Sequence, residues 1–506
     1  EAVQAVHMVA LALSVDPLRW FAFEQFQLGH PDRYLLPYYE QGLCDGTLTP
    51  EKAQLLLDCL GIQINRRVPH GLSCGYMVGG RDRSGRLVAN EVTTLCMRVV
   101  EDIRLVYPSV GLCYTSEMPD CYLQQACEIL AQGRSHPAIF NDDIITQGLM
   151  EYGMPEDEAH CYIHSTCVEI TPDSSSNVWV ASPYISLVQP LFSVMEREYP
   201  DMDAFCAAYC AELNTTIARE FEVQNNFRRE RAARSMNPLL SCLVNDCLER
   251  GLDIEKGGAR YNWIMPSFIG MANLADALTA IRTLVFEEKR LSMADFKAML
   301  DCDYEGYEAQ RQEILHRIPK YGNDNDEVDG WCDWITTHIA RECRKYTPRF
   351  SEGRWIPSVF CWIMHAQMGA ETGATPDGRK AGFPLGDGSG PAQGRERNGP
   401  TASLLSSTKW SHKEFVGGVA VNLKFSKRVF CADSCCAMLA LIKTYMQRGG
   451  FEVQINVVDR ETLLDARRNP EQHRDLVVRI GGYSDYFVRL PEKMQEEVLQ
   501  RTEHTL

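Results

Sequence analysis

A cysteine and a glutamate stand two residues apart in the stretch HSTCVEI, which covers residues 164–170. The residues from 162 to 171 are largely apolar and β-branched and predict a buried, extended segment. On a regular strand Cys167 and Glu169 would face the same side, because side chains alternate between the two faces. A thiol and a carboxylate in one cavity form a reactive pair, since the sulfur can react and the carboxylate can move a proton. The alternative is a packing cysteine beside a solvated glutamate, with His164 as a core histidine.

A second stretch, VVRIGGYSDYF at residues 477–487, places two adjacent glycines between a β-branched run and a tyrosine-rich segment. The local pattern favours a tight turn, because glycine adopts a positive φ without steric cost. A chemical role for Gly481 or Gly482 needs a partner elsewhere in the chain. At this point both interpretations stay open.

Two other segments resemble ligand sites but lack residues that such sites require. KYGNDNDEVD (320–329) has the acidic density of a calcium loop, yet the glycine and the closing glutamate of an EF-hand are misplaced, so a helix cap or a solvated loop is expected. GDGSG (386–390) could cradle a phosphate but has neither the lysine of a P-loop nor a preceding strand. Paired C-x-x-C sets and H-E-x-x-H are also missing, so no metal site is expected.

The overall composition is that of an acidic globular protein. The 506 residues are 45% hydrophobic and 24% charged, and the formal net charge of −17 would repel nucleic acid or an anionic membrane. No apolar run reaches the roughly 20 residues that a membrane helix needs. Twenty cysteines in helix-like contexts fit free thiols in a reducing, anaerobic cytoplasm better than a secreted disulfide scaffold. We therefore expect a cytoplasmic protein with neither a nucleic-acid nor a membrane partner.

The elements that must position the reactive residues alternate between helices and short apolar strands. Helices are expected at 49–65, 90–106, 119–133, over 183–300, near 434–447 and from 460, and strands at 162–171, 414–425 and 451–459. Such alternation indicates an α/β fold, either a barrel or a doubly wound sheet.

Residues 372–400 are rich in glycine and proline, a composition that no helix survives. This segment is expected to be a long ordered loop or a joint that flexes between domains. It separates a larger section, residues 1–375, from a compact C-terminal section, residues 376–506. The chain starts at Glu1 inside a run with helical periodicity, so we expect it to be a fragment of a longer protein.

Several motifs in a fixed order resemble the glycyl radical enzymes, the pyruvate formate-lyase-like superfamily. The order runs from Cys-Val-Glu through YGNDNDEVD, TPDGRKAGFPLGDG, GPTA and QINVVDRETLLDARRNPEQHRDLVVRIGGYSDYF to RTEH. The most specific element is Arg-x-x-Gly-Tyr, which here runs from Arg479 to Tyr483. The resemblance covers essentially the whole chain and implies an α/β barrel surrounded by helices, with a cysteine loop and a glycine loop meeting in its interior. Residues 1–375 would be the barrel domain, lacking its N-terminal part, and 376–506 the glycine radical domain.

The resemblance implies that Gly482, directly before the tyrosine, carries a stored backbone radical. A Cα radical is delocalised into the flanking amide groups and needs a planar centre, which a side chain would crowd. Gly481 would have a steric role, leaving room that a side chain would fill. Gly482 would take a hydrogen atom from Cys167, and the resulting thiyl radical would take one from a substrate carbon. The Cys-x-Glu spacing resembles the dehydratase and lyase branch, where Glu169, with a pKa raised by burial, would act as general base.

The resemblance also implies partners and supporting residues. No cofactor would be bound, and a radical-SAM activating enzyme with a [4Fe-4S] cluster would install the radical on Gly482. The other partners would be a small-molecule substrate and a second copy of the chain in a homodimer, in the cytoplasm or in a bacterial microcompartment. His164, Trp179, Arg479 and Tyr483 are expected to bind substrate or to support the site.

The chain departs from the dehydratase branch at three positions. Thr166 replaces the usual glycine before the cysteine, and Ile170 replaces the usual proline after the glutamate. Polyol dehydratases have an aspartate shortly after a tryptophan, whereas Trp179 is followed here by Val-Ala-Ser. Protonation of a leaving hydroxyl then needs His164 or another donor, and glycerol or 1,2-propanediol is disfavoured as the substrate.

Three functions remain open from the sequence. The first is a glycyl radical lyase or dehydratase that eliminates water or another leaving group from a small polar substrate. The second is a C–C bond-cleaving or -forming enzyme of the formate acetyltransferase or decarboxylase type, which the single cysteine and the retained Glu169 disfavour. The third is a truncated, non-catalytic homologue, which the presence of Cys167, Glu169 and Gly482 disfavours.

Overall fold

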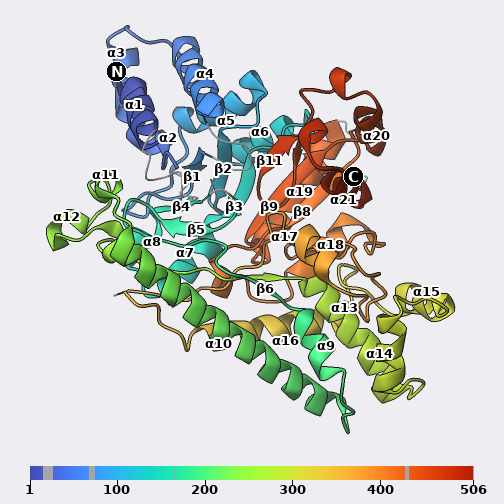
Figure 1. Ribbon diagram of the computed structural model, residues 1–506. Helices are drawn as coiled ribbons and strands as arrows, with labels where there is room; N and C mark the ends of the chain where they lie inside the picture. The colour runs from blue at the N-terminus through green and yellow to red at the C-terminus, as the bar shows by residue number, and fades with distance from the viewer. Residues whose placement is uncertain (15–26, 68–73, 166, 351, 428–431, 505–506) are drawn as a thin grey trace.

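The computed structural model describes residues 1–506 except 15–26, 68–73, 166, 351, 428–431 and 505–506. Helices surround a central group of strands, and the N-terminus and the C-terminus lie on different sides of that group (Figure 1). Within the described ranges, no helix combines the length and the apolar character needed to cross a bilayer.

A five-stranded sheet forms one side of the barrel. Its order is β1 (Gly75–Gly79), β2 (Ser109–Tyr114), β3 (Ala138–Asn141), β9 (Glu452–Val457) and β8 (Asn422–Phe425). β1 to β3 run parallel, β9 and β8 run parallel to each other, and the two groups meet in an antiparallel pair in which Ile139 is opposite Val453. β1 to β3 are buried along their whole length, which explains their lack of polar alternation. The sheet therefore joins segments that are far apart in the chain.

A ladder of short parallel pairings forms the other side of the barrel. β6 (Tyr184–Ser186) pairs with β7 (Ser267–Ile269), and parallel bridges extend this pairing through Ser358 and from Val359 to Val419. Because the chain from Val419 runs directly into β8, the ladder is continuous with the five-stranded sheet. Sheet and ladder together form the α/β barrel that the resemblance implies.

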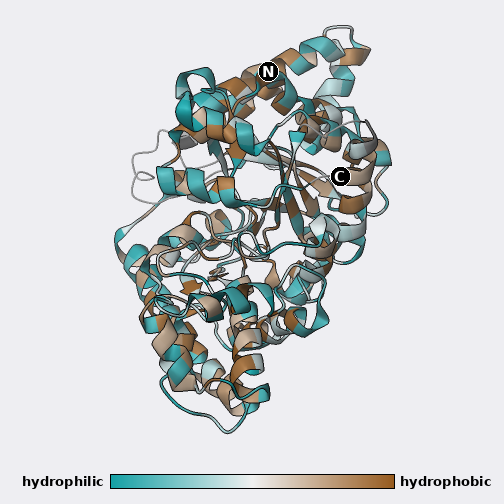
Figure 2. Ribbon diagram, turned by 90° about the vertical axis from the view of Figure 1, so that its right-hand side faces the viewer, coloured by the Kyte–Doolittle hydropathy of each residue, from teal (hydrophilic) through white to brown (hydrophobic). Residues whose placement is uncertain are grey.

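Amphipathic helices cover the outside of this barrel. α5 (Glu91–Ile103) and α6 (Asp120–Ala131) pack on the five-stranded sheet, and α10 (Met202–Arg234) runs along the ladder side (Figure 1). Asn90 caps α5 by accepting the backbone N–H groups of its first turn, and one face of that helix is buried. Hydrophobic residues predominate in the central strands, whereas the outer helices carry both hydrophobic and hydrophilic residues (Figure 2).

The remaining helices connect or flank these layers. They are α1 (Ala2–Ser14), α2 (Pro31–Tyr34), α3 (Leu36–Cys44), α4 (Pro50–Arg67), α7 (Asp142–Glu151), α8 (Glu156–Ala159), α9 (Gln189–Val194), α11 (Pro238–Ser241), α12 (Cys247–Arg250), α13 (Met271–Ile281), α14 (Met293–Asp301), α15 (Glu308–His316), α16 (Asp326–Cys343), α17 (Met364–Glu371), α18 (Gly399–Ser407), α19 (Ala432–Gln447), α20 (Arg460–Arg468) and α21 (Glu492–Gln500). Cys96, Cys113 and Cys127, which are buried, are free thiols.

Most elements expected from the sequence are confirmed, among them α4, α5, α6, α19, α20 and β9. The strand expected over 414–425 is shorter, because residues 413–415 form a 3-10 turn and Asn422–Phe425 join the sheet. The region 183–300 is not uniformly helical, since it contributes β6 and β7 to the barrel wall. The acidic segment 320–329 caps α16 through Asn325, as the helix-cap alternative predicts.

The glycine- and proline-rich segment is ordered and largely buried. The sequence predicts no helix over 372–400; residues 372–398 contain none, whereas Gly399 and Pro400 begin α18. Arg379 donates to four backbone carbonyls within this segment, and Asn273 binds both Asp377 and the N–H of Gly386. The expected long ordered loop is confirmed, and these contacts argue against its use as a flexing joint.

Two small antiparallel hairpins bring their tips together. They are β4 (Tyr162–His164) with β5 (Ile170–Pro172), and β10 (Val477–Arg479) with β11 (Ser484–Tyr486). We call the first the cysteine hairpin, with residues 165–169 as its tip, and the second the glycine hairpin, with residues 480–483 as its tip. The glycine tip is buried, and so are residues 167–169 of the cysteine tip.

Candidate active site

Gly482 and Cys167 meet where the two tips touch. Gly482 has a φ of +91°, a left-handed conformation that favours glycine. A Cβ built at Gly482 would overlap the Cβ of Cys167 and would lie 2.9 Å from its Sγ. The α-hydrogen in that position therefore points at the side chain of Cys167, with Sγ close beside it. Cys167 is 5% exposed, so the two groups face each other out of contact with bulk water.

Glu169 lies in the same tip as Cys167 and is 1% exposed. Its Oε2 accepts hydrogen bonds from the Ser165 hydroxyl (2.8 Å) and the Val168 backbone N–H (3.1 Å). Burial raises the pKa of Glu169 to about 6, although these donors act in the opposite direction. At neutral pH the carboxylate is therefore mostly ionised and well matched to accept a proton.

The local geometry differs from the strand expected across 162–171. Cys167 and Glu169 lie in the turn between β4 and β5, so the alternation of a regular strand does not apply to them. The N–H of Ser165 donates to the carbonyl oxygen of Glu169 (2.7 Å) and closes this turn. Ile170, the position where the family usually has proline, begins β5. Thr166 lies outside the described residues.

His164 is a buried residue of β4. Its ring stacks on Phe140, with ring centroids 5.5 Å apart, and neither ring nitrogen has a hydrogen-bond partner among the described residues. Burial, and then the charge of Arg479, lowers the pKa of His164 to about 3. The ring is therefore neutral at physiological pH, which argues against His164 as the acid for a leaving hydroxyl.

Trp179 belongs to the ladder side of the barrel. Its backbone exchanges hydrogen bonds with Trp263 and Met265 of the neighbouring segment. The guanidinium groups of Arg228 and Arg231 lie over its ring, at 4.9 and 5.3 Å from the centroid. Both arginines belong to α10, so the contacts that fix the ring come from the outer helix and not from the two tips.

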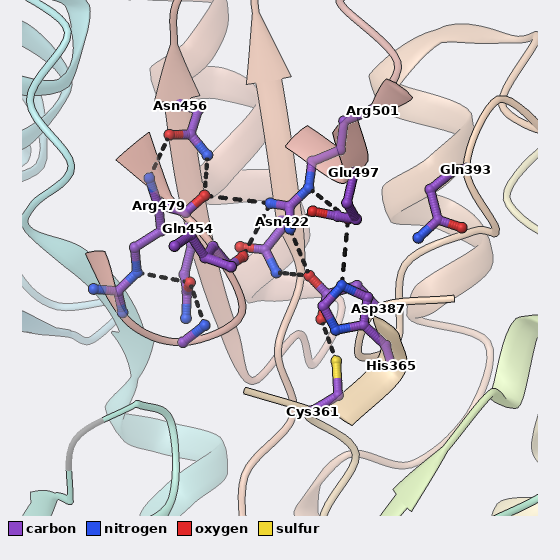
Figure 3. A network of polar contacts seen from close by, with 12 residues as sticks. Cys361, His365, Asp387, Gln393, Asn422, Gln454, Asn456, Arg479, Glu497 and Arg501 are labelled. Atoms are coloured by element: carbon purple, nitrogen blue, oxygen red, sulfur yellow. Dashed lines mark hydrogen bonds and ion pairs between the residues drawn. The ribbon is translucent and has the colours of Figure 1, made fainter. Parts of the chain in front are cut away.

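Arg479 and two amide side chains of β9 hold the glycine tip on one side (Figure 3). Arg479 is fully buried, and its Nε donates to Oε1 of Gln454 (2.7 Å). The same oxygen accepts the N–H of Gly482 at 3.3 Å. Asn456 pairs with the backbone N–H and carbonyl of Arg479, at 2.8 and 2.9 Å. Gln454 therefore connects the buried guanidinium directly to the reactive glycine.

Tyr483 and Gly481 complete the tip. The carbonyl of Tyr483 accepts the N–H of Ile480 (2.8 Å), and its ring meets Trp362 edge-on at 6.4 Å. A Cβ at Gly481 would overlap the carbonyl oxygen of Trp362. The space at Gly481 thus agrees with the steric role expected from the sequence.

A buried charged cluster beside the glycine tip was missed by the sequence reasoning. It consists of Asp387, Glu497 and Arg501, which are linked by ion pairs of 3.3 and 2.9 Å (Figure 3). Asp387 stands in the GDGSG stretch and also in TPDGRKAGFPLGDG, which supports the resemblance without implying a role for this residue. Arg501 stands in RTEH, a motif that supports the resemblance to the family but to which no role was assigned. No spacing rule connects these positions, because the fold alone brings them together.

Cys361, His365 and Asp387 form the group of described residues whose donor atoms lie close enough to hold a metal ion, within 4.8 Å of one another. The thiol of Cys361 already donates to Asp387 (2.6 Å), and burial, followed by that carboxylate, raises the pKa of Cys361. Arg501 and Asn422 also bind Asp387. Hydrogen-bond donors of the protein therefore already stabilise the negative charge of Asp387.

The arrangement as a whole allows hydrogen-atom transfer between a glycine Cα and a thiol. The two atoms belong to different tips, so the exchange depends on how firmly each tip is held. A buried carboxylate next to the thiol can accept a proton from a molecule that reacts there.

The chain matches two family models. Residues 1–369 match the model described as pyruvate formate lyase-like, and residues 385–488 match the model described as glycine radical. The first match covers more than half of the chain.

Curated relatives and solved structures agree with these matches. Trans-4-hydroxy-L-proline dehydratase of Clostridioides difficile is 30% identical, over 100% of this chain and 67% of its own length. Isethionate sulfite-lyase of Nitratidesulfovibrio vulgaris is 29% identical, over 94% of this chain and 62% of its own length. The glycerol-bound B12-independent glycerol dehydratase from Clostridium butyricum has a TM-score of 0.91 and 30% identity, over 95% of this chain and 64% of that structure. The chain therefore spans 62 to 67% of the length of these relatives.

Proposed function

The chain belongs to the pyruvate formate-lyase-like family of glycyl radical enzymes, and on this premise we propose that it is a glycyl radical lyase or dehydratase. It uses a thiyl radical to eliminate water or another leaving group from a small polar substrate. The observation that carries this proposal is the α-hydrogen position of Gly482, which faces Sγ of Cys167 next to a carboxylate with a raised pKa.

The first step moves one hydrogen atom between the two tips. The Cα radical of Gly482 takes the hydrogen of the Cys167 thiol, so an S–H bond breaks and a C–H bond forms. The thiyl radical then takes a hydrogen atom from a substrate carbon and becomes a thiol again. When the product radical recovers that hydrogen atom, Cys167 and Gly482 return to their starting states and no electron is gained or lost.

Glu169 acts while the substrate carries the radical. It removes the proton of the hydroxyl on the radical carbon, and the resulting ketyl radical expels the leaving group from the adjacent carbon. Its pKa of about 6 suits this role, because the base is ionised at neutral pH and can still hold the proton it receives. Ala181 lies in the stretch where polyol dehydratases have an acid, so a leaving group that departs as a stable anion fits this chain better than hydroxide.

Glycyl radical enzymes need an activating enzyme and act on small molecules. For this chain we propose a radical-SAM enzyme with a [4Fe-4S] cluster as the activating partner, no bound cofactor, and a homodimer in the cytoplasm or in a microcompartment. The barrel domain is assigned to residues 1–375 and the glycine radical domain to residues 376–506.

Reconstitution of the full-length protein with its activating enzyme tests the proposal. Electron paramagnetic resonance should show a doublet, because one α-hydrogen remains on Gly482. A substrate screen should include vicinal diols, hydroxyproline and hydroxyalkyl sulfonates. Elimination products support the lyase, C–C cleavage products support the acetyltransferase or decarboxylase alternative, and the absence of any radical in the full-length protein supports a non-catalytic homologue.

A further inference from the structure

An arginine directly after α21 reaches back to the glycine tip. The side chain of Arg501 is 10% exposed. Its Nη1 donates to the carbonyl oxygens of Ile480 (2.9 Å) and Arg479 (3.3 Å). These two carbonyls directly precede Gly481 and Gly482, so the guanidinium holds the chain where it enters the glycine pair (Figure 3).

Two buried carboxylates fix this guanidinium. Nε and Nη2 of Arg501 donate to the two oxygens of Glu497 (3.0 and 2.9 Å), and Nη2 also reaches Asp387 (3.3 Å). Burial alone would raise the pKa of Glu497, but Arg501 and then His365 lower it to about 2. Burial would likewise lower the pKa of Arg501, yet Glu497 and Asp387 raise it. Arg501 and Glu497 are therefore both charged, and the planar fork of arginine suits such a two-point contact.

Asp387 connects this cluster to the barrel wall. Its Oδ2 accepts from the side-chain amide of Asn422 (2.8 Å), at the start of β8. Its Oδ1 accepts from the thiol of Cys361, three residues before α17. Arg501 therefore ties both the C-terminal helix and the glycine tip to elements that belong to the barrel.

We propose that Arg501 is a positioning residue that holds the glycine tip so that the α-hydrogen of Gly482 faces Cys167. Arg501 acts through the backbone carbonyls and does not touch the reacting atoms. Gln454 holds the opposite side of the tip through the Gly482 N–H, so side chains from β9 and from the end of α21 enclose the glycine pair. The purpose of this hold rests on the proposed function, whereas the hold itself can be measured in the resting protein.

Hydrogen–deuterium exchange of the unactivated protein tests the hold directly. The amides of Ile480 and Gly482 are bonded to the Tyr483 carbonyl and to Gln454 Oε1. In Arg501→Gln both should exchange roughly tenfold faster than in the wild type, because local opening no longer breaks a charged hydrogen-bond network. Exchange in the cysteine hairpin should stay constant. Unchanged exchange at the glycine tip overturns the proposal, and so does an equal rise along the whole chain.

Two further variants separate the positioning role from general stability. Arg501→Lys keeps the positive charge but not the fork, so it should give a smaller rise at the same amides and remains informative where the glutamine variant fails to fold. Arg467→Gln, in α20, removes the ion pairs that this arginine makes with Glu496 and Glu492 of α21, the helix that precedes Arg501. This variant should leave hydrogen exchange at the glycine tip unchanged. A rise at the tip as large in Arg467→Gln as in Arg501→Gln assigns the effect to α21 as a whole and overturns the proposal.

The lifetime of the radical gives a second, independent measurement. After activation, the doublet of Arg501→Gln should decay roughly tenfold faster than that of the wild type under a fixed low pressure of dioxygen, because a loosened tip exposes Gly482 more often. A wild-type protein without a doublet contradicts the proposed function. Equal decay in the two proteins contradicts the positioning role alone.

Discussion

The cysteine hairpin and the glycine hairpin have the same architecture but are held in different ways. Each consists of two three-residue antiparallel strands and a short tip. In the cysteine tip most polar groups bind one another, since Ser165 and Val168 both donate to Glu169, and Gln27 donates to the Ser165 carbonyl from outside the hairpin. In the glycine tip one bond is internal, from the Ile480 N–H to the Tyr483 carbonyl, and the others come from Gln454 of β9 and from Arg501.

Packing does not separate the two tips, because both are buried in the same core. Val168 of the cysteine tip and Ile480 of the glycine tip are fully buried, and a Cβ at Gly418 would come within 2.8 Å of the Val168 side chain. The difference lies in the polar contacts, since the glycine tip is also attached to the barrel by side-chain bonds that can break and re-form. Under the proposed function this difference has a purpose, because the radical must be installed by an enzyme that reaches Gly482 from outside.

The largest expected effect is that of Gly482→Ala. Both the doublet and turnover should disappear, because the added Cβ overlaps Cys167 and crowds the planar radical centre. Paramagnetic resonance of the activated variant measures this. Gly330→Ala in α16 is the matched control, since a Cβ there meets no atom within 4 Å. Gly481→Ala is unsuitable as a control, because its Cβ would overlap the Trp362 carbonyl. A doublet that survives in Gly482→Ala places the radical on another residue.

Cys167→Ser should separate the two tips functionally. Turnover should fall to background, because the O–H bond of a serine hydroxyl is too strong for a glycyl radical to take its hydrogen atom. The doublet should persist, since storage of the radical needs the glycine tip and not the thiol. Resonance and product assays on the same sample check this, and measurable turnover would remove Cys167 from the proposed pathway.

Glu169→Gln should lower turnover by roughly 10²- to 10⁴-fold, the usual contribution of a general base. The doublet should again persist, because the substitution lies in the cysteine tip. Steady-state kinetics with the substrate from the screen measure the effect. Unchanged kcat in this variant would exclude the proton-removal step assigned to Glu169.

The pH dependence should report the same carboxylate. kcat/KM should fall as the pH drops through about 6, because burial raises the pKa of Glu169 to about 6 and the protonated group is no longer a base.

The stability of the folded protein should depend on the same carboxyl group. The folded state holds the proton of Glu169 more tightly than the unfolded chain does, so ionisation of this group lowers the free energy of unfolding by about 2 kcal/mol at neutral pH. Denaturant unfolding should therefore show Glu169→Gln gaining stability relative to the wild type as the pH rises from 4 to 8. An unchanged stability difference over that range would contradict the raised pKa.

The smallest effect concerns the resting protein. Hydrogen exchange should be faster in the glycine hairpin and α21 than in the cysteine hairpin and β9. β9 is paired with β3, so residues 400–506 cannot leave the barrel as one unit without breaking the central sheet. Equal exchange in the two hairpins would contradict this difference, and joint opening of the whole of 400–506 would contradict the fixed position of β9 in the sheet.

The resemblance to the glycyl radical enzymes predicted the pairing of Cys167 with Gly482, whereas the residue types alone left both a tight turn and a chemical role open for Gly482. Neither predicted Gln454 and Asn456, which alternate with apolar residues along β9 as solvent-facing polar residues would. Both are buried, and they point at the glycine hairpin. Which face of a strand meets water depends on what packs against it, and the local pattern does not contain that information. The role of Arg501 could not be predicted for a similar reason, because its partners Asp387 and Ile480 lie in separate parts of the chain.

The antiparallel pairing of β3 with β9 has a consequence for biosynthesis. β3 leaves the ribosome about 300 residues before its partner strand β9, so the middle of the sheet has an open edge while the chain between them is made. Contacts of such high sequence separation make folding slow. The nascent barrel therefore depends on protection from aggregation until β9 docks, and the glycine tip, which follows β9 in the chain, can reach the cysteine tip only after that docking.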